Sequence, residues 1–153
     1  MTNLELMRAA LEEARAAEVA GEVPIGAVVL FEDRIVARGQ NRVLRDNDPT
    51  AHAEIVALRA AAQAIGNYRL AGCTLVSTLE PCAMCAGAMI HARIDRLVFA
   101  TDDPKAGAAG SVLSILNHAA LNHRMVVDRG LLAEESAVLL REFFQRRRSS
   151  STT

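Results

Sequence analysis

Apolar residues recur at helical spacing in three long stretches of the chain. In LELMRAALEEAR the apolar positions lie three and four residues apart, which predicts an amphipathic helix over residues 3–20. The alanine-rich stretch 51–65 has the same spacing and is followed by Gly66, a residue typical of helix ends. LLAEESAVLLREFFQRRR predicts a last helix.

Shorter apolar runs between these stretches predict β-strands. VPIGAVVLF and IVARG are joined by the polar turn EDR, which is typical of a hairpin. CTLVST, DRLVFAT and RMVVDRG predict three more strands. Pro81 suits the first position of another helix, because its missing N–H loses no partner there. The stretch 102–123 is irregular, with one helical turn expected at SVLSIL.

The alternation of strands and helices indicates an α/β fold, with a sheet of about five strands covered by helices. The opening hairpin makes this sheet mixed rather than parallel. We expect one domain over 1–148 and a frayed tail over 149–153, since 153 residues suffice for a single core.

Composition argues against a membrane-spanning protein and against a disulfide-rich secreted one. No apolar run reaches membrane-spanning length, and three cysteines without an export signal favour reduced thiols in the cytoplasm. The formal net charge of −1 argues against broad nonspecific binding to nucleic acid, although it allows a local basic patch.

Two of the cysteines, Cys82 and Cys85, lie three residues apart in TLEPCAMCAGAM. In a helix this spacing puts both on one face, and at a helix N-terminus the backbone N–H groups and the helix dipole favour thiolates. Two sulfurs do not complete a zinc site, so a third ligand is needed. His52, in PTAHAEIVAL, also lies at an expected helix start.

Ligands from one histidine and two cysteines leave a fourth tetrahedral position open, as in catalytic zinc sites. Glu54 then has a role other than binding the metal. A carboxylate next to an activated water can take its proton and deliver it to a substrate nitrogen.

Other interpretations compete with this one. A lone CxxC also occurs in redox pairs and structural zinc sites, but the cysteine count excludes a four-cysteine site. We expect Cys73 to be a buried free thiol, and His91 and His118 to be ordinary polar residues. H-x-E and P-C-x-x-C together are far more specific than either half, and this combination is the known signature of zinc nucleobase deaminases.

The resemblance extends beyond the signature. DPTAHAEIVALR, TLEPCAMCAGAMIHARI, KAGAAGS, LNHR and LLREFFQRRR together resemble the bacterial tRNA-specific adenosine deaminases, and the likeness runs from about residue 5 to 148. The resemblance implies a cytidine-deaminase-like three-layer α/β/α sandwich and a homodimer. It also implies one Zn²⁺ per chain on His52, Cys82 and Cys85, with Glu54 as the proton shuttle.

The implied reaction converts adenosine to inosine at the anticodon wobble position of an arginine tRNA. The resemblance places Asn41 against the flipped base. It also places a larger set near the RNA: Asp103, Lys105, Asn122, His123, Phe143, Phe144, Arg146, Arg147 and Arg148.

Alternatives stay open for several of these residues. Adjacent phenylalanines point in different directions, so we expect at least one of Phe143 and Phe144 to pack in the core. Asp103 either accepts a hydrogen bond from a ribose 2′-OH or stabilises its own turn in TDDPK. At the level of the whole protein, the alternatives are an enzyme that deaminates free guanine or cytidine and, more distantly, a zinc-stabilised binding module.

Overall fold

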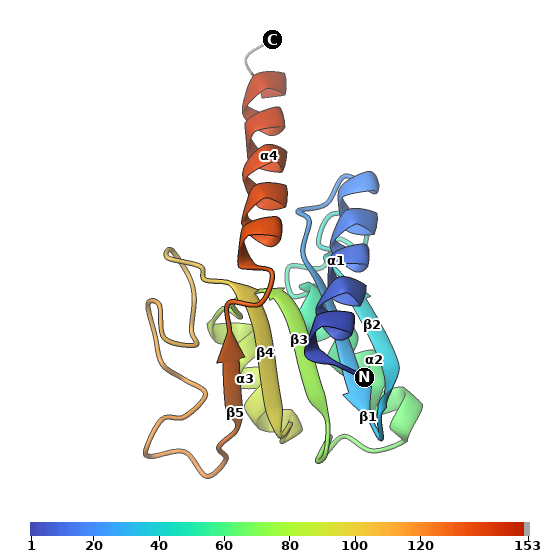
Figure 1. The fold of residues 1–153 in the computed structure, drawn as a ribbon, viewed down its shortest axis with the longest axis vertical. Coiled ribbons are helices and arrows are strands. Elements are labelled where there is room, and N and C mark those ends of the chain that lie inside the picture. Colours follow the sequence, from blue (N-terminus) through green and yellow to red (C-terminus); the bar gives the residue numbers. More distant parts are fainter. Residues whose placement is uncertain (152–153) are drawn as a thin grey trace.

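Five strands form a single mixed sheet in the order β2-β1-β3-β4-β5 (Figure 1). The computed structural model describes residues 1–151. Its strands are β1 (Gly26–Phe31), β2 (Arg34–Gln40), β3 (Thr74–Leu79), β4 (Arg96–Thr101) and β5 (Val126–Arg129). Its helices are α1 (Asn3–Val19), α2 (Ala53–Ile65), α3 (Ala83–Ala92) and α4 (Ala133–Ser151).

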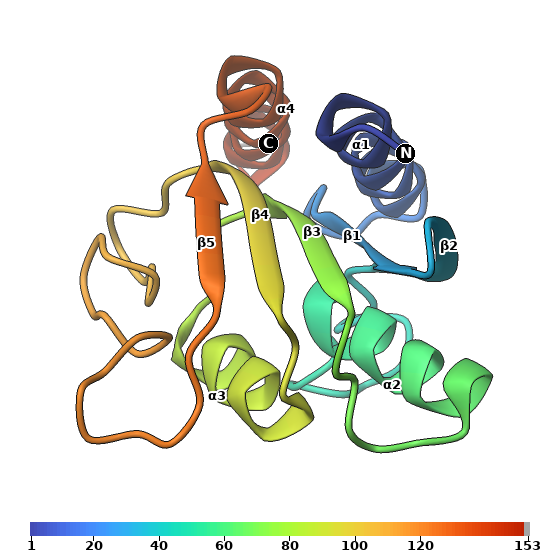
Figure 2. The same cartoon turned by 60° about the horizontal axis from the view of Figure 1, so that its bottom comes forward.

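Strand β1 runs antiparallel to both of its neighbours, whereas β3, β4 and β5 are parallel to one another. Helices α1 and α4 lie on one face of the sheet, and α2 and α3 lie on the other (Figure 2). The predicted three-layer α/β/α sandwich with a mixed five-stranded sheet is therefore confirmed.

Alternation along the strands explains why the sheet has two cores. Val28 and Val76 face the layer that contains α1, where they pack with Leu6 and Met7. Their strand neighbours point to the opposite face and pack with residues of α2 and α3, in a cluster that includes Val29, Leu75, Leu58 and Met89. Buried apolar side chains on both faces are what a helix-covered sheet requires.

Local sequence signals fix the helix ends. Thr2 caps α1 through a capping box, in which its side chain accepts from the Glu5 N–H and the Glu5 carboxylate accepts from the Thr2 N–H. Gly66 ends α2 with a φ of 77°, a left-handed conformation that favours glycine. Within the described residues 1–151, no helix has both the length and the hydropathy to cross a membrane.

Two local predictions need correction. Helix α3 begins at Ala83 with Cys82 as its N-cap, so Pro81 precedes the helix rather than opening it. The Pro81 carbonyl instead accepts a hydrogen bond from the Ala108 N–H at 2.8 Å, which ties this turn to a distant loop. SVLSIL forms no helical turn, because an isolated bridge between Ala109 and Ser114 folds that segment back on itself.

Helix α4 also differs from its predicted range. It starts at Ala133 rather than at the preceding leucines, because Leu132 has a φ of 56° and cannot join a right-handed helix. It continues to Ser151, into the range 149–153 that was predicted as a frayed tail; residues 152–153 lie outside the described part of the chain. An ion pair between Arg146 and Glu18 of α1, at 2.7 Å, anchors the late turns of α4.

Candidate active site

The N-termini of α2 and α3 bring the three predicted metal ligands together. His52 is the N-cap of α2, Cys82 is the N-cap of α3, and Cys85 lies in the first turn of α3. Neither N-cap side chain makes a capping hydrogen bond to its own helix. Both are therefore available to meet Cys85.

The ligand atoms are spaced as a zinc ion requires. The Nδ1 atom of His52 lies 3.7 Å from Sγ of Cys82 and 3.5 Å from Sγ of Cys85. Tetrahedral zinc, with ligands at about 2.3 Å for sulfur and about 2.0–2.1 Å for nitrogen, puts pairs of ligand atoms roughly 3.5–3.8 Å apart. All three lie within 4.8 Å of one another, so these residues fit the metal.

The two helix N-termini also make the site electrostatically suited to a cation held by thiolates. Hydrogen bonds from Cys85 and His52 lower the pKa of the Cys82 thiol to about 3. The hydrogen bond to Cys82 and burial together raise the pKa of Cys85. The cluster therefore stabilises the thiolate form of Cys82 next to two helix N-termini. The thiolate is the form of cysteine that binds zinc.

Glu54 lies in the first turn of α2, with only 4% of its surface exposed. Burial raises the pKa of its carboxyl to about 7, against the opposing effects of a backbone hydrogen bond and of His52. Glu54 is not one of the three residues that form the metal cluster. A buried carboxyl that gains and loses a proton near neutral pH is suited to proton transfer.

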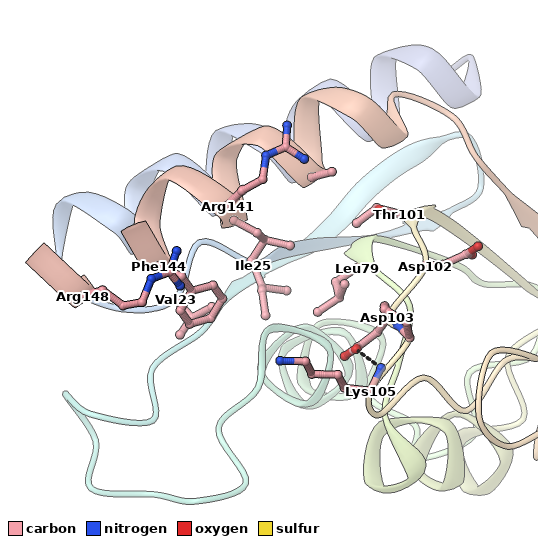
Figure 3. Close-up of a pocket in the computed structure, with 13 residues that line it drawn as sticks. Val23, Ile25, Leu79, Thr101, Asp102, Asp103, Lys105, Arg141, Phe144 and Arg148 are labelled. Carbon is pink, nitrogen blue, oxygen red and sulfur yellow. Dashed lines mark hydrogen bonds between the residues drawn. The ribbon is translucent and has the colours of Figure 1, made fainter. Parts of the chain in front are cut away.

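A cavity of about 740 Å³ lies between α4 and the carboxyl ends of β3 and β4 (Figure 3). None of the cluster residues lines it. Four of the predicted RNA contacts share it with Arg141 and Leu79: Asp103 and Lys105 from the loop after β4, and Phe144 and Arg148 from α4.

A second cavity, of about 430 Å³, adjoins the first, because Val23 and Phe144 line both. Asn41, Phe143 and Arg147 line the second cavity as well. The two cavities together therefore contact seven of the predicted RNA-binding residues. These are Asn41, Asp103, Lys105, Phe143, Phe144, Arg147 and Arg148.

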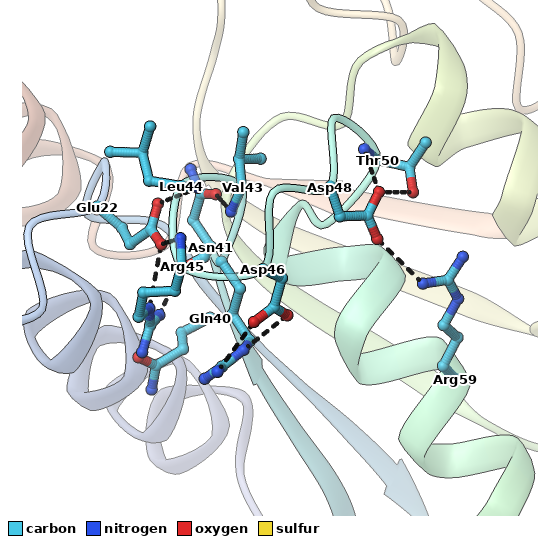
Figure 4. Close-up of polar contacts among 11 residues, drawn as sticks. Glu22, Gln40, Asn41, Val43, Leu44, Arg45, Asp46, Asp48, Thr50 and Arg59 are labelled. Atoms are coloured by element: carbon cyan, nitrogen blue, oxygen red, sulfur yellow. Dashed lines mark hydrogen bonds and ion pairs between the residues drawn. The ribbon is translucent and has the colours of Figure 1, made fainter.

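A buried carboxylate shapes the loop on the side of Asn41 (Figure 4). Glu22, 1% exposed, accepts hydrogen bonds from the backbone N–H groups of Leu44 and Arg45 and pairs with the Arg45 guanidinium at 3.0 Å. The Asn41 side chain accepts from the Val43 N–H at 3.1 Å. The backbone beside the second cavity is thus fixed by side chains rather than by a strand.

The two phenylalanines of α4 point in different directions, as the sequence predicts. Phe143 is buried at 6% exposure, whereas Phe144 is 45% exposed and meets it edge to face, with 5.4 Å between ring centroids. The Arg147 guanidinium lies 4.9 Å from the Phe143 ring centroid and donates to the Gly21 carbonyl. Phe144 is the aromatic ring of this pair that is accessible to a ligand.

Asp103 also makes local hydrogen bonds, and the other three predicted RNA contacts, Asn122, His123 and Arg146, line neither of the two cavities. Asp103 accepts hydrogen bonds from the N–H groups of Lys105 and Ala106, at 3.0 and 3.2 Å, so it stabilises its own turn. His123 bonds to the Ile94 carbonyl, just past the C-terminal end of α3, and Asn122 is exposed beside it. Since α3 has 10 residues, this end lies about 15 Å from the metal cluster.

Other histidines and the third cysteine behave as expected. Cys73 is fully buried in the core, and burial raises the pKa of its thiol to about 11. His91 and His118 are exposed.

Sequence reasoning missed two buried carboxylates, Glu22 and Glu80. Each directly follows an apolar or small residue and is followed closely by a proline, in GEVP and LEP. A glutamate between an apolar or small residue and a nearby proline, in a loop before or after a strand, is the signal that would have found them.

Residues 1–101 match the family described as the cytidine and deoxycytidylate deaminase zinc-binding region. A tRNA-specific adenosine deaminase from Haemophilus influenzae is 51% identical over 145 residues, which cover 94% of this chain and 84% of the relative.

Two solved structures are also similar. One, of a tRNA:A34 deaminase studied for A-to-I editing at the wobble position of transfer RNA, has a TM-score of 0.86 at 46% identity and covers 89% of this chain and 99% of that chain. The other, of a guanine deaminase from Nitrosomonas europaea, has a TM-score of 0.79 at 31% identity and covers 92% of this chain and 83% of that chain.

Proposed function

The chain belongs to the cytidine and deoxycytidylate deaminase family, and on that premise we propose that it hydrolyses adenosine to inosine at the anticodon wobble position of tRNA. The observation that carries the proposal is the cluster of His52, Cys82 and Cys85 beside a buried Glu54. The high identity to a tRNA-specific adenosine deaminase over most of both chains favours a tRNA substrate.

His52, Cys82 and Cys85 would hold one Zn²⁺ per chain. A zinc ion in such a site supplies a water molecule that is activated for attack at neutral pH. Glu54 would accept the two protons of that water in turn at its carboxylate, and would deliver the first to the adenine ring and the second to the departing amine. The overall reaction consumes one water, places oxygen on C6 and releases ammonia.

The two adjoining cavities would receive the anticodon loop. C6 of adenine is inaccessible in a stacked base, so the target nucleotide must leave the stack. Phe144 offers an exposed ring for stacking, and Lys105, Arg141 and Arg148 line the same cavity with positive charge. Asn41, in the adjoining cavity, is the predicted contact of the flipped base.

We further propose that the enzyme is a cytoplasmic homodimer that acts on an arginine tRNA. Cys82 and Cys85 must stay reduced to bind zinc, and the cytoplasm keeps thiols reduced. Asn122 and His123 stay predicted RNA contacts, at a surface separate from the two cavities. Native mass spectrometry of the zinc-loaded protein tests the dimer and the metal stoichiometry together, with two chains and two zinc ions as the expected mass.

The proposed substrate is tested against its alternatives in one experiment. Purified protein is incubated with an arginine tRNA anticodon stem-loop, with free guanine and with cytidine, and the products are separated by chromatography. We expect inosine from the stem-loop, and no xanthine or uridine. Xanthine without inosine would assign the chain to guanine deamination, which the similarity to the Nitrosomonas europaea enzyme makes the second candidate.

A further inference from the structure

One buried carboxylate outside the metal cluster makes all of its hydrogen bonds to a single loop. Glu80 directly follows β3 and is 1% exposed. Its Oε1 accepts from the Asp103 N–H at 3.0 Å and from the Ser111 hydroxyl at 2.5 Å. Its Oε2 accepts from the N–H groups of Ala109 and Ser111, at 2.9 and 3.1 Å.

The loop also encloses this carboxylate sterically. A Cβ atom on Gly107 would lie 2.4 Å from Cδ of Glu80 and 2.5 Å from each of its oxygens, so no larger residue fits while the loop keeps its position. Arg129 of β5 supplies the countercharge, with Nη2 lying 3.7 Å from Oε1 of Glu80. The same guanidinium pairs with Asp102 at 2.9 Å and donates to the Ala109 carbonyl at 3.1 Å.

A buried charge is a costly way to gain stability. Burial of a carboxylate costs free energy that its partners must offset, and replacement of buried ionic groups by apolar ones is often neutral or stabilising. The four donors of Glu80 all belong to residues 103–111. The Glu80 carboxylate therefore fixes the position of one loop, residues 103–111.

That loop connects the metal cluster to the first cavity. Asp102, Asp103, Pro104 and Lys105 form one wall of the 740 Å³ cavity. The Ala108 N–H donates to the Pro81 carbonyl, next to Cys82, at 2.8 Å. Because Glu80 lies two residues before Cys82, a single turn positions both a zinc ligand and the cavity wall.

We propose that Glu80 is a positioning residue for substrate binding: it holds loop 102–111 so that Asp103 and Lys105 form a fixed wall for the RNA. This inference rests on the proposed function, since it assigns the wall to the RNA of that reaction. Loss of the Glu80 carboxylate loosens the loop and weakens substrate binding, while the metal cluster stays intact.

The sequence offers a specific probe of this loop. Lys105 is the only lysine in the chain, so an endoproteinase that cleaves only after lysine can cut the protein only here. Cleavage under native conditions measures how often the loop opens. If only the loop opens, the rate of cleavage depends weakly on low concentrations of urea. If cleavage requires global unfolding, the rate rises strongly with urea, so its urea dependence separates the two processes.

The test compares Glu80→Gln and Gly107→Ala with wild type and with Glu12→Gln. The glutamine keeps the shape but loses acceptor capacity, and the alanine displaces the loop without changing Glu80. The control removes a carboxylate whose side chain is 70% exposed on α1. We expect both loop variants to be cut at least about tenfold faster, with weak urea dependence, and Glu12→Gln to match wild type.

Steady-state kinetics on the stem-loop completes the test. We expect the KM of Glu80→Gln to rise about tenfold, with kcat within about threefold and zinc content equal to wild type, which a purely structural defect would not produce. Unchanged cleavage, or faster cleavage with unchanged KM, would overturn the proposal, as would loss of zinc. If wild type does not deaminate the stem-loop, the proposed function fails, while the cleavage rates still report whether Glu80 holds the loop.

If Glu80→Gln does not fold, Ser111→Ala takes its place, because it deletes only the hydroxyl donor and keeps the backbone N–H. An intermediate increase in cleavage and in KM supports the proposal, and wild-type values of both overturn it.

Discussion

The two phenylalanines of α4 should differ sharply when each is replaced by alanine. Phe143 is 6% exposed, so Phe143→Ala removes a nearly fully buried ring and lowers the free energy of unfolding by about 3 kcal/mol. For a domain of this size that corresponds to a fall in Tm of roughly 6–12 °C. Phe144 is 45% exposed, so Phe144→Ala costs about 1 kcal/mol, mostly through the lost edge-to-face pair.

The effects on RNA binding should be reversed. Phe144 lines both cavities with an exposed ring, and a base stacked on an aromatic ring is worth about 1–3 kcal/mol. Phe144→Ala should therefore weaken stem-loop binding about tenfold while its Tm falls by no more than roughly 4 °C.

Thermal denaturation and stem-loop titration on the same preparations measure both quantities. Phe143→Leu is the matched control, because it keeps apolar volume at the buried position. Equal losses of Tm in the two alanine variants, or normal RNA affinity in Phe144→Ala, would refute the division of roles between the two rings.

Three further predictions concern carboxylates. Glu54→Gln should retain zinc by metal analysis and lose about 10²–10⁴-fold in kcat, since Glu54 transfers protons and lies outside the metal cluster; loss of zinc in this variant would contradict that assignment. Asp103→Asn keeps an acceptor oxygen for the turn at Lys105 but removes the negative charge. The ratio of deaminase activity on a DNA copy of the anticodon loop to activity on the RNA should therefore rise. An unchanged ratio together with a lower Tm would show that Asp103 only stabilises its turn. Burial disfavours the charged form of Glu22, but hydrogen bonds from Arg45 and Leu44 outweigh burial and lower the pKa of its carboxyl. The Tm of wild type should therefore exceed that of Glu22→Gln by its full amount at pH 7, and this difference should shrink as the pH falls below 4.5. A Tm difference that does not change with pH would show that the charge of Glu22 contributes nothing to stability.

The periodicity of apolar residues predicted the helices and strands of this fold, because the burial of apolar side chains determines where these elements form. Val28 and Val29 pack on opposite faces of the sheet, and such runs of buried apolar residues identified β1, β3 and β4, whereas β2 and β5 at the sheet edges are only partly buried. The meeting of His52, Cys82 and Cys85 was also predictable, because each lies at a helix N-terminus that the sequence marks.

The details that were mistaken depend on long-range contacts. The carbonyl of Pro81 bonds to Ala108, and this partner lies in a loop that no local pattern connects to the proline. The role of Glu80 is invisible for the same reason, because its donors lie 23 to 31 residues away in the sequence. Leu132 looks like part of α4 by hydropathy, and only its backbone conformation excludes it.

The central claim is tested most directly by the position of the product in the RNA. Zinc-loaded protein is incubated with two anticodon stem-loops, one with adenosine at the wobble position and one with that adenosine moved by a single nucleotide. Reverse transcription then maps inosine, which is read as guanosine. The account predicts inosine at the wobble position of the first RNA and none in the second. Inosine in neither RNA, from protein that carries its zinc and converts guanine to xanthine, would contradict it.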